Sequence, residues 1–140
     1  MNQAVLRATE GVPIWDDLTM LHHVALEVRP EDAAAEGEFW LAVGFERVAA
    51  PRSLGEGYDW YEREGTQIHL METAEPSKPP ARGHVAVVAP EFDETVARLR
   101  ARGFEVSEGS RHWGARRGKA HTPAGHVVEL MEFPPRAGAN

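Results

Sequence analysis

The chain has 140 residues, enough for one compact domain, and contains no cysteine, which excludes disulfides and thiolate chemistry. Its formal net charge is −7, without a dense run of lysine and arginine, which argues against nucleic acid or an anionic membrane as the main partner. No apolar stretch is long enough to span a bilayer or to form the core of a signal peptide, so we expect a cytoplasmic protein.

The first 19 residues share no pattern with the rest of the chain. This N-terminal arm carries two large apolar side chains, Ile14 and Trp15, which are suited to packing on the domain or on a second subunit. The alternative is a partly ordered leader.

The segment after the arm, residues 20–73, predicts one βαβββ module. Its strands alternate apolar and polar residues, as expected for strands with one face in the core. Turn and proline signals separate these strands. The predicted strands are residues 21–28, 45–49, 58–63 and 66–71.

The helix of this module is predicted between its first two strands. Ala35, Phe39 and Val43 recur at every fourth position and form the predicted buried stripe. Gly44 is expected to end the helix, because glycine readily adopts the left-handed conformation found there.

A proline-rich linker leads into a second module with the same order of elements. Its helix has a predicted buried stripe of Phe92, Val96 and Leu99. We therefore expect a single α+β domain, residues 20–133, built of two tandem βαβββ modules. The predicted arm, first module, linker, second module and frayed tail are residues 1–19, 20–73, 74–83, 84–133 and 134–140.

Two pairs of short passages indicate that the second module is a copy of the first. Residues 66–72 read TQIHLME and residues 126–132 read HVVELME. The tripeptide His23-Val24-Ala25 returns as His84-Val85-Ala86. A unit that occurs twice is a duplicated supersecondary module, since a solenoid needs at least three copies to bury its core.

Four repeat-related strands each carry one potential metal ligand on the face opposite to their apolar row. Three imidazoles and one carboxylate are a suitable donor set for a first-row divalent ion. They leave the bound ion with a net positive charge, which favours a Lewis-acid role. The four predicted ligands are His23, His69, His84 and Glu129.

A basic segment and two tryptophans are the predicted substrate contacts. Arg116 and Arg117 lie near Trp113 in an otherwise acidic chain and suit a carboxylate or phosphate of the substrate. The alternative is an ordinary charged hairpin. Trp60 is predicted to line the cleft, whereas His22, beside a predicted ligand, is interpreted as structural or exposed.

Four passages together resemble the vicinal oxygen chelate superfamily: LHHVALEV at 21–28, FWLAVGF at 39–45, GHVA at 83–86 and TPAGHVVE at 122–129. This superfamily includes glyoxalase I, methylmalonyl-CoA epimerase, fosfomycin-resistance thiol transferases, extradiol dioxygenases and bleomycin-binding proteins. The resemblance implies that each module curls its mixed sheet into half of a cleft holding a divalent metal, and that the chain forms a homodimer. His23, His84 and Glu129 match the family's ligand positions. His69 stands where glyoxalase I has a glutamate and the epimerase a glutamine.

The leading hypothesis is a metal-dependent lyase or isomerase acting on a small oxygenated metabolite. One divalent ion (Zn²⁺, Ni²⁺, Co²⁺, Mn²⁺ or Fe²⁺) would stabilise an oxyanion of the substrate, while Glu129 or His69 moves a proton. Thiol transfer to an antibiotic is a variant of this hypothesis. A second hypothesis is an extradiol-type dioxygenase that binds Fe²⁺ through His23, His84 and Glu129. A fourth ligand at His69 counts against it, because that ligand would occupy a position that such an enzyme needs open. A third is a metal-free drug-binding protein with an aromatic cleft.

Overall fold

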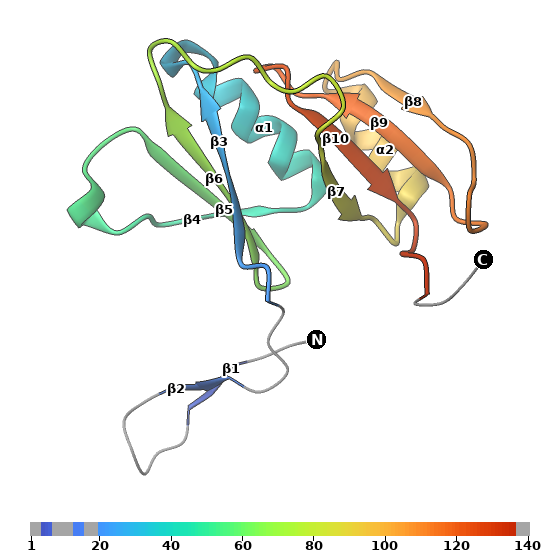
Figure 1. Cartoon of the computed structure of the whole chain (residues 1–140), viewed down its shortest axis with the longest axis horizontal. Coiled ribbons are helices and arrows are strands. Elements are labelled where there is room, and N and C mark those ends of the chain that lie inside the picture. Colours follow the sequence, from blue (N-terminus) through green and yellow to red (C-terminus); the bar gives the residue numbers. More distant parts are fainter. Residues whose placement is uncertain (1–3, 7–12, 16–19, 137–140) are drawn as a thin grey trace.

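The computed structural model of the protein describes residues 4–6, 13–15 and 20–136. The part of the chain from residue 20 folds into two modules with the same order of elements (Figure 1). The first module contains β3 (His23–Val28), α1 (Ala33–Val43), β4 (Glu46–Val48), β5 (Tyr58–Arg63) and β6 (Thr66–Glu72). The second contains β7 (Val85–Val88), α2 (Phe92–Ala101), β8 (Val106–Glu108), β9 (Arg117–His121) and β10 (Val127–Met131).

Each module contributes one four-stranded mixed sheet. The strand orders are β3-β6-β5-β4 and β7-β10-β9-β8, so the first and last strands of each module are neighbours. These two strands run parallel and all other pairs are antiparallel. The predicted α+β class and the duplicated module are confirmed, whereas the curl of the sheets around a cleft stays a prediction.

The N-terminal arm contributes a third, two-stranded sheet. Strand β1 (Ala4–Leu6) pairs with β2 (Pro13–Trp15) in antiparallel register, and neither belongs to a module's sheet. The remainder of the arm and the last four residues of the predicted tail lie outside the described residues. Docking of the arm therefore stays a prediction.

Strand β3 alternates between a buried and an exposed face, as predicted, whereas β6 and β10 each bury three consecutive residues, among them His69 and Glu129. In β3, Leu26 and Val28 are buried while His23 and Glu27 are exposed. The apolar faces of both sheets and the two helices enclose one core. The donor positions thus lie on the sheet faces turned away from this core.

Helix α1 buries a wider face than the sequence predicted, and one member of its predicted stripe is wrong. Phe39 and Val43 are buried, but Ala35 is exposed. Gly37 faces β5 instead, where a Cβ atom at this position would overlap Tyr61 Oη. The missing side chain lets the tyrosine pack directly on the helix, which rotates the buried face away from Ala35.

Helix α2 has the predicted buried stripe, since Phe92, Val96 and Leu99 are all buried. The two modules meet through these helices, with the rings of Phe39 and Phe104 in edge-to-face contact at 5.3 Å between centroids. Among the described residues, no helix is both long and apolar enough to cross a membrane.

A buried carboxyl group that was not predicted from the sequence joins the modules. Glu36 of α1 is fully buried, and its Oε2 accepts a hydrogen bond of 2.9 Å from the backbone N–H of Ala124, in the turn between β9 and β10. Within the described part of the chain, its Oε1 is buried without a hydrogen-bond partner. Loss of hydration on burial raises the pKa of Glu36, although the hydrogen bond from Ala124 and the nearby Thr122 side chain act in the opposite direction.

Candidate metal and substrate site

Two predicted ligands of the first module, His23 and His69, lie against each other. Parallel pairing of β3 with β6 places them on the same face, and their rings stack with centroids 4.0 Å apart and planes inclined by 14°. The other side of the His69 ring is covered by Trp60, at 3.9 Å and 2°. His69 is therefore sandwiched between two rings and only 7% exposed.

A hydrogen-bonded chain fixes the proton of His69. Gln67 donates its amide N–H to Glu62 Oε1 at 2.8 Å, which orients the amide oxygen towards His69 Nε2 at 2.7 Å. Nε2 is accordingly the donor, which leaves the lone pair on Nδ1. Burial, followed by the neighbouring histidines, lowers the pKa of His69 to about 4, so the ring is neutral at pH 7.

The stacking limits what this pair offers a metal ion. The lone pair of an imidazole nitrogen lies in the plane of its ring, and two nearly parallel rings cannot both direct their lone pairs at one ion between them. In the observed arrangement the pair presents one imidazole to an ion. Joint ligation by His23 and His69 would need a different rotamer of one ring.

His22, interpreted from the sequence as structural or exposed, is exposed and lies close to this pair. Its Nδ1 lies 2.9 Å from Nδ1 of His23, so one of the two nitrogens donates and the other accepts. The observed strand begins at His23, and the alternation used to place His22 on the core side does not extend to it.

The second module brings its two predicted ligands together. His84 Nε2 lies 3.6 Å from Glu129 Oε2, and the Glu129 side chain is 7% exposed. His84 Nδ1 donates a hydrogen bond of 2.8 Å to the backbone oxygen of Arg82. Because a carbonyl oxygen can only accept, the ring proton is fixed on Nδ1 and a neutral His84 points its Nε2 lone pair at the carboxylate.

This geometry suits a bound cation. A lone pair facing a carboxylate oxygen is repulsive unless a proton or a positive ion lies between them. Two ligands that bind a divalent ion at about 2.0 to 2.2 Å with a tetrahedral angle between them are roughly 3.3 to 3.6 Å apart, close to the separation of His84 Nε2 and Glu129 Oε2. These two residues fit one side of a metal site.

Arg117, predicted to bind substrate, is bonded to Glu129 instead. Its Nε lies 2.7 Å from Glu129 Oε1, and its Nη2 donates to the same oxygen. Its guanidinium also lies 5.2 Å from the ring centroid of Trp113. Arg117 and Trp113 are thus next to a predicted ligand, and the arginine already has an anionic partner; their contact with a substrate stays a prediction.

Arg116 lies away from the donor set. It forms ion pairs with Asp93 of α2 and with Glu108 of β8, and its guanidinium lies 4.8 Å from the ring centroid of Phe92. Asp93 belongs to α2, whereas Glu108 also lines a cavity beside Glu129. A substrate role for Arg116 stays a prediction.

A cavity of about 340 Å³ opens beside Glu129. Lys119, directly opposite Glu129 in the register of β9 and β10, lines it together with His112. The serines Ser107 and Ser110 add hydroxyl groups to its lining. These four residues were not predicted as a set from the sequence, although the alternation of β9 already places Lys119 on the face of Arg117.

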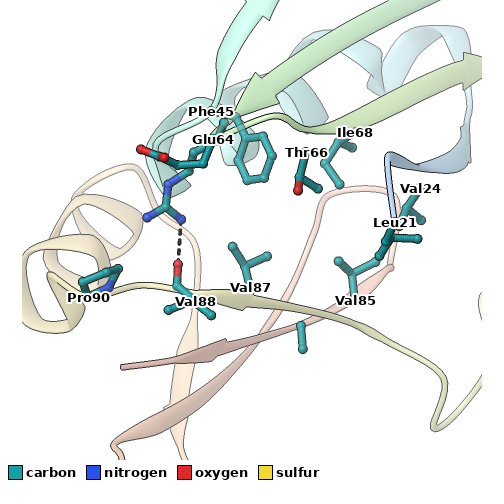
Figure 2. A pocket seen from close by; sticks show the side chains of 12 residues that line it. Leu21, Val24, Phe45, Glu64, Thr66, Ile68, Val85, Val87, Val88 and Pro90 are labelled. Atoms are coloured by element: carbon teal, nitrogen blue, oxygen red, sulfur yellow. Dashed lines mark hydrogen bonds between the residues drawn. The ribbon is translucent and has the colours of Figure 1, made fainter. Parts of the chain in front are cut away.

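A second cavity, of about 390 Å³, lies between the modules and is lined mainly by apolar side chains (Figure 2). Val24 and Ile68 from one sheet face Val85 and Val87 from the other. None of the predicted site residues lines this cavity. It is therefore separate from the donor set.

The two donor pairs lie on different sheets. Across residues 20–136 and the two short strands of the arm, no group of three or more histidine, aspartate or glutamate side chains is placed to hold one metal ion. Each module carries half of the predicted site.

Residues 20–130 match the model of the family described as Glyoxalase/Bleomycin resistance protein/Dioxygenase superfamily. No curated protein matches the chain significantly.

Several solved structures share the fold. A glyoxalase family protein from Bacillus anthracis is 22% identical, with a TM-score of 0.71 over 86% of this chain and 100% of that one. A mutant of the fosfomycin resistance protein FosX from Listeria monocytogenes, complexed with Mn(II) and 1S,2S-dihydroxypropylphosphonic acid, is 23% identical, with a TM-score of 0.65 and coverage of 84% and 92%. TnmS3, an antibiotic binding protein from Streptomyces sp. CB03234, is 20% identical, with a TM-score of 0.64 and coverage of 83% and 97%. At these identities the similarity establishes the fold alone.

Proposed function

Because the chain belongs to the Glyoxalase/Bleomycin resistance protein/Dioxygenase superfamily, we propose that it is a divalent-metal-dependent enzyme of the lyase or isomerase kind. Its substrate is a small oxygenated metabolite. The observation that carries this proposal is the pair His84 and Glu129, whose Nε2 and Oε2 face each other at 3.6 Å. With a proton held on His84 Nδ1, the neutral ring offers Nε2 as a ligand atom beside Glu129 Oε2.

The complete site is formed by two copies of the chain. The pair on the second module supplies His84 and Glu129, and the first module of a partner copy supplies His23. A homodimer of this kind explains why each sheet of one chain carries only half of the donors. Two histidines and one carboxylate leave positions on the ion open for a substrate.

The bound ion would act as a Lewis acid on the substrate's oxygens. Among the protein groups, His69 is the better candidate for moving a proton, because its neutral ring has a free lone pair on Nδ1. Glu129 has one oxygen bonded to Arg117 and the other facing His84, which leaves it no oxygen for proton transfer. Trp60 holds the His69 ring in place from one side.

The cavity beside Glu129 suggests that the substrate carries an anionic group. Lys119 and His112 line it, and Lys119 forms no ion pair within the described part of the chain. A carboxylate or phosphate bound there would be next to the proposed ion.

Metal analysis tests this proposal. The proposed homodimer has two complete sites. Protein purified without chelator should therefore contain about one divalent ion per chain. The variant His84→Ala should lose the ion, whereas His121→Ala, which removes an exposed histidine of the same module, should retain it. A wild-type protein that neither contains a divalent ion nor takes one up would exclude the metal-dependent function.

The stacking of His23 on His69 supports a second candidate, the extradiol-type dioxygenase. With one imidazole from that pair, the ligand set has two histidines and one carboxylate, which suits Fe²⁺ and O₂. The fourth ligand that counted against this hypothesis is then missing. Oxygen consumption by the Fe²⁺-loaded protein with a catechol would favour the dioxygenase over the lyase or isomerase.

The third candidate, a metal-free drug-binding protein, is supported by the Trp60 ring, which stacks on His69 on the donor face of the first sheet. Such a protein would not need a lone pair on His84 directed at a carboxylate. A purified protein that contains no divalent ion and takes none up would select this candidate.

A further inference from the structure

Arg117 holds one oxygen of the proposed ligand Glu129. Both its Nε, at 2.7 Å, and its Nη2 donate to Oε1. The other oxygen, Oε2, is left facing His84 Nε2. The carboxylate is therefore fixed with one oxygen bound to the protein and one directed at the proposed ion.

The guanidinium is itself held from two sides. Its Nη1 donates a hydrogen bond of 3.0 Å to the backbone oxygen of Ser110, and its flat face lies near the ring of Trp113. The indole N–H of Trp113 donates in turn to the backbone oxygen of Phe133 at 2.7 Å. These contacts restrict rotation of Arg117 and, through it, of the Glu129 carboxylate.

Contacts of this kind matter in metal sites because they set the direction of the ligand atoms. Losing one typically weakens metal binding by about 10- to 100-fold. His84 has the equivalent support in its bond to the Arg82 backbone oxygen. Both ligands of the second module are thus held in place before an ion binds.

We propose that Arg117 is a positioning residue for Glu129 and does not bind the anionic group of the substrate; this inference rests on the proposed metal-dependent function. The anionic group would then contact Lys119 and His112, the other basic groups lining the cavity beside Glu129. The sequence prediction of a substrate role for Arg117 is replaced by a role in metal binding.

Two substitutions that conserve charge test this inference. Arg117→Lys keeps the positive charge but loses the planar fork that directs two N–H groups at one oxygen. Arg102→Lys is the matched control, because it makes the same exchange at another arginine of the second module that pairs with a carboxylate, Glu38 of α1, away from the proposed ligands. The dissociation constant for Mn²⁺ is measured by calorimetry on metal-free protein, and urea unfolding of the metal-free form checks the fold.

We expect Arg117→Lys to weaken Mn²⁺ binding by about 10-fold or more, and Arg102→Lys to leave it unchanged. Trp113→Phe, which keeps a ring beside Arg117 but loses the bond to Phe133, should weaken binding by a smaller factor and serves as the test if Arg117→Lys does not fold. If folded Arg117→Lys binds Mn²⁺ as tightly as the wild type, the inference is overturned and the proposed function stays intact. If only Trp113→Phe folds, unchanged Mn²⁺ affinity in that variant has the same meaning. A wild-type protein that binds no divalent ion would instead overturn the proposed function and the inference together.

Discussion

A mixed dimer would test directly whether the two donor pairs meet across two chains. One chain carries His23→Ala and the other carries His84→Ala, so each pure homodimer lacks a ligand at both of its sites. In a mixed dimer with cross-chain sites, one site loses both histidines. The other site keeps His23 from one chain and His84 from its partner, and is complete.

The expected occupancy follows from this geometry. Random pairing of equal amounts of the two chains gives mixed dimers in about half of the population, so the mixture should bind about one ion per four chains. Purification through two different affinity tags isolates the mixed dimer, which should bind one ion per dimer. If each site were built within one chain, every site would lack a histidine.

Elemental analysis and Mn²⁺ titration of the doubly tagged dimer supply the measurement. Neither substituted residue is deeply buried, since His23 is exposed and the His84 side chain is 33% exposed, so both chains should fold. A mixed dimer that binds no more metal than the two homodimers would refute the cross-chain arrangement.

Two further predictions concern the core. Because the pKa of Glu36 is raised above its ordinary value of 4.5 by burial, its protonated form stabilises the fold below the unfolded pKa, and this contribution is lost as the pH rises through the folded pKa. The free energy of unfolding is measured with urea at pH values from below the unfolded pKa of Glu36 to above its folded pKa. In Glu36→Gln this free energy should decline less with rising pH than in the wild type. An equal decline in both proteins would show that Glu36 is not the cause. Gly37→Ala should destabilise the protein by about 1 to 3 kcal/mol through its clash with Tyr61, whereas alanine at a free helix position is stabilising. Tyr61→Phe in the Gly37→Ala background should recover part of the loss, because it removes the nearest atom.

The duplicated module and the faces of its strands could be predicted because both depend on local patterns. The alternation of Leu26 and Val28 with His23 follows from strand geometry alone, and the repeat then transfers the same assignment to the second module. The stripe of α1 depended on tertiary contact. Ala35 has the helical spacing, but the close approach of Tyr61 to Gly37 determines which face is buried.

The sequence predicted which types of residue lie at the site, but not which side chains pair with each other there. The sequence placed Arg116 and Arg117 together, yet their side chains have different partners in the structure. Arg116 binds carboxylates near α2, while Arg117 binds Glu129. Adjacent residues of an extended chain point to opposite sides of a sheet, so a basic run at a strand end divides its charges between the core side and the donor side.

The same rule explains why one chain does not complete the predicted site. Duplication places a donor at the same point of each module, always on the face opposite to the apolar row. The apolar rows meet in the single core that the modules share. The contacts that hold the two modules together are therefore on the opposite face of each sheet from the donors. Nothing in that packing brings His23 towards His84. A second copy can supply the missing half without any change in the core, because His23 is exposed and the His84 side chain is 33% exposed on the folded chain.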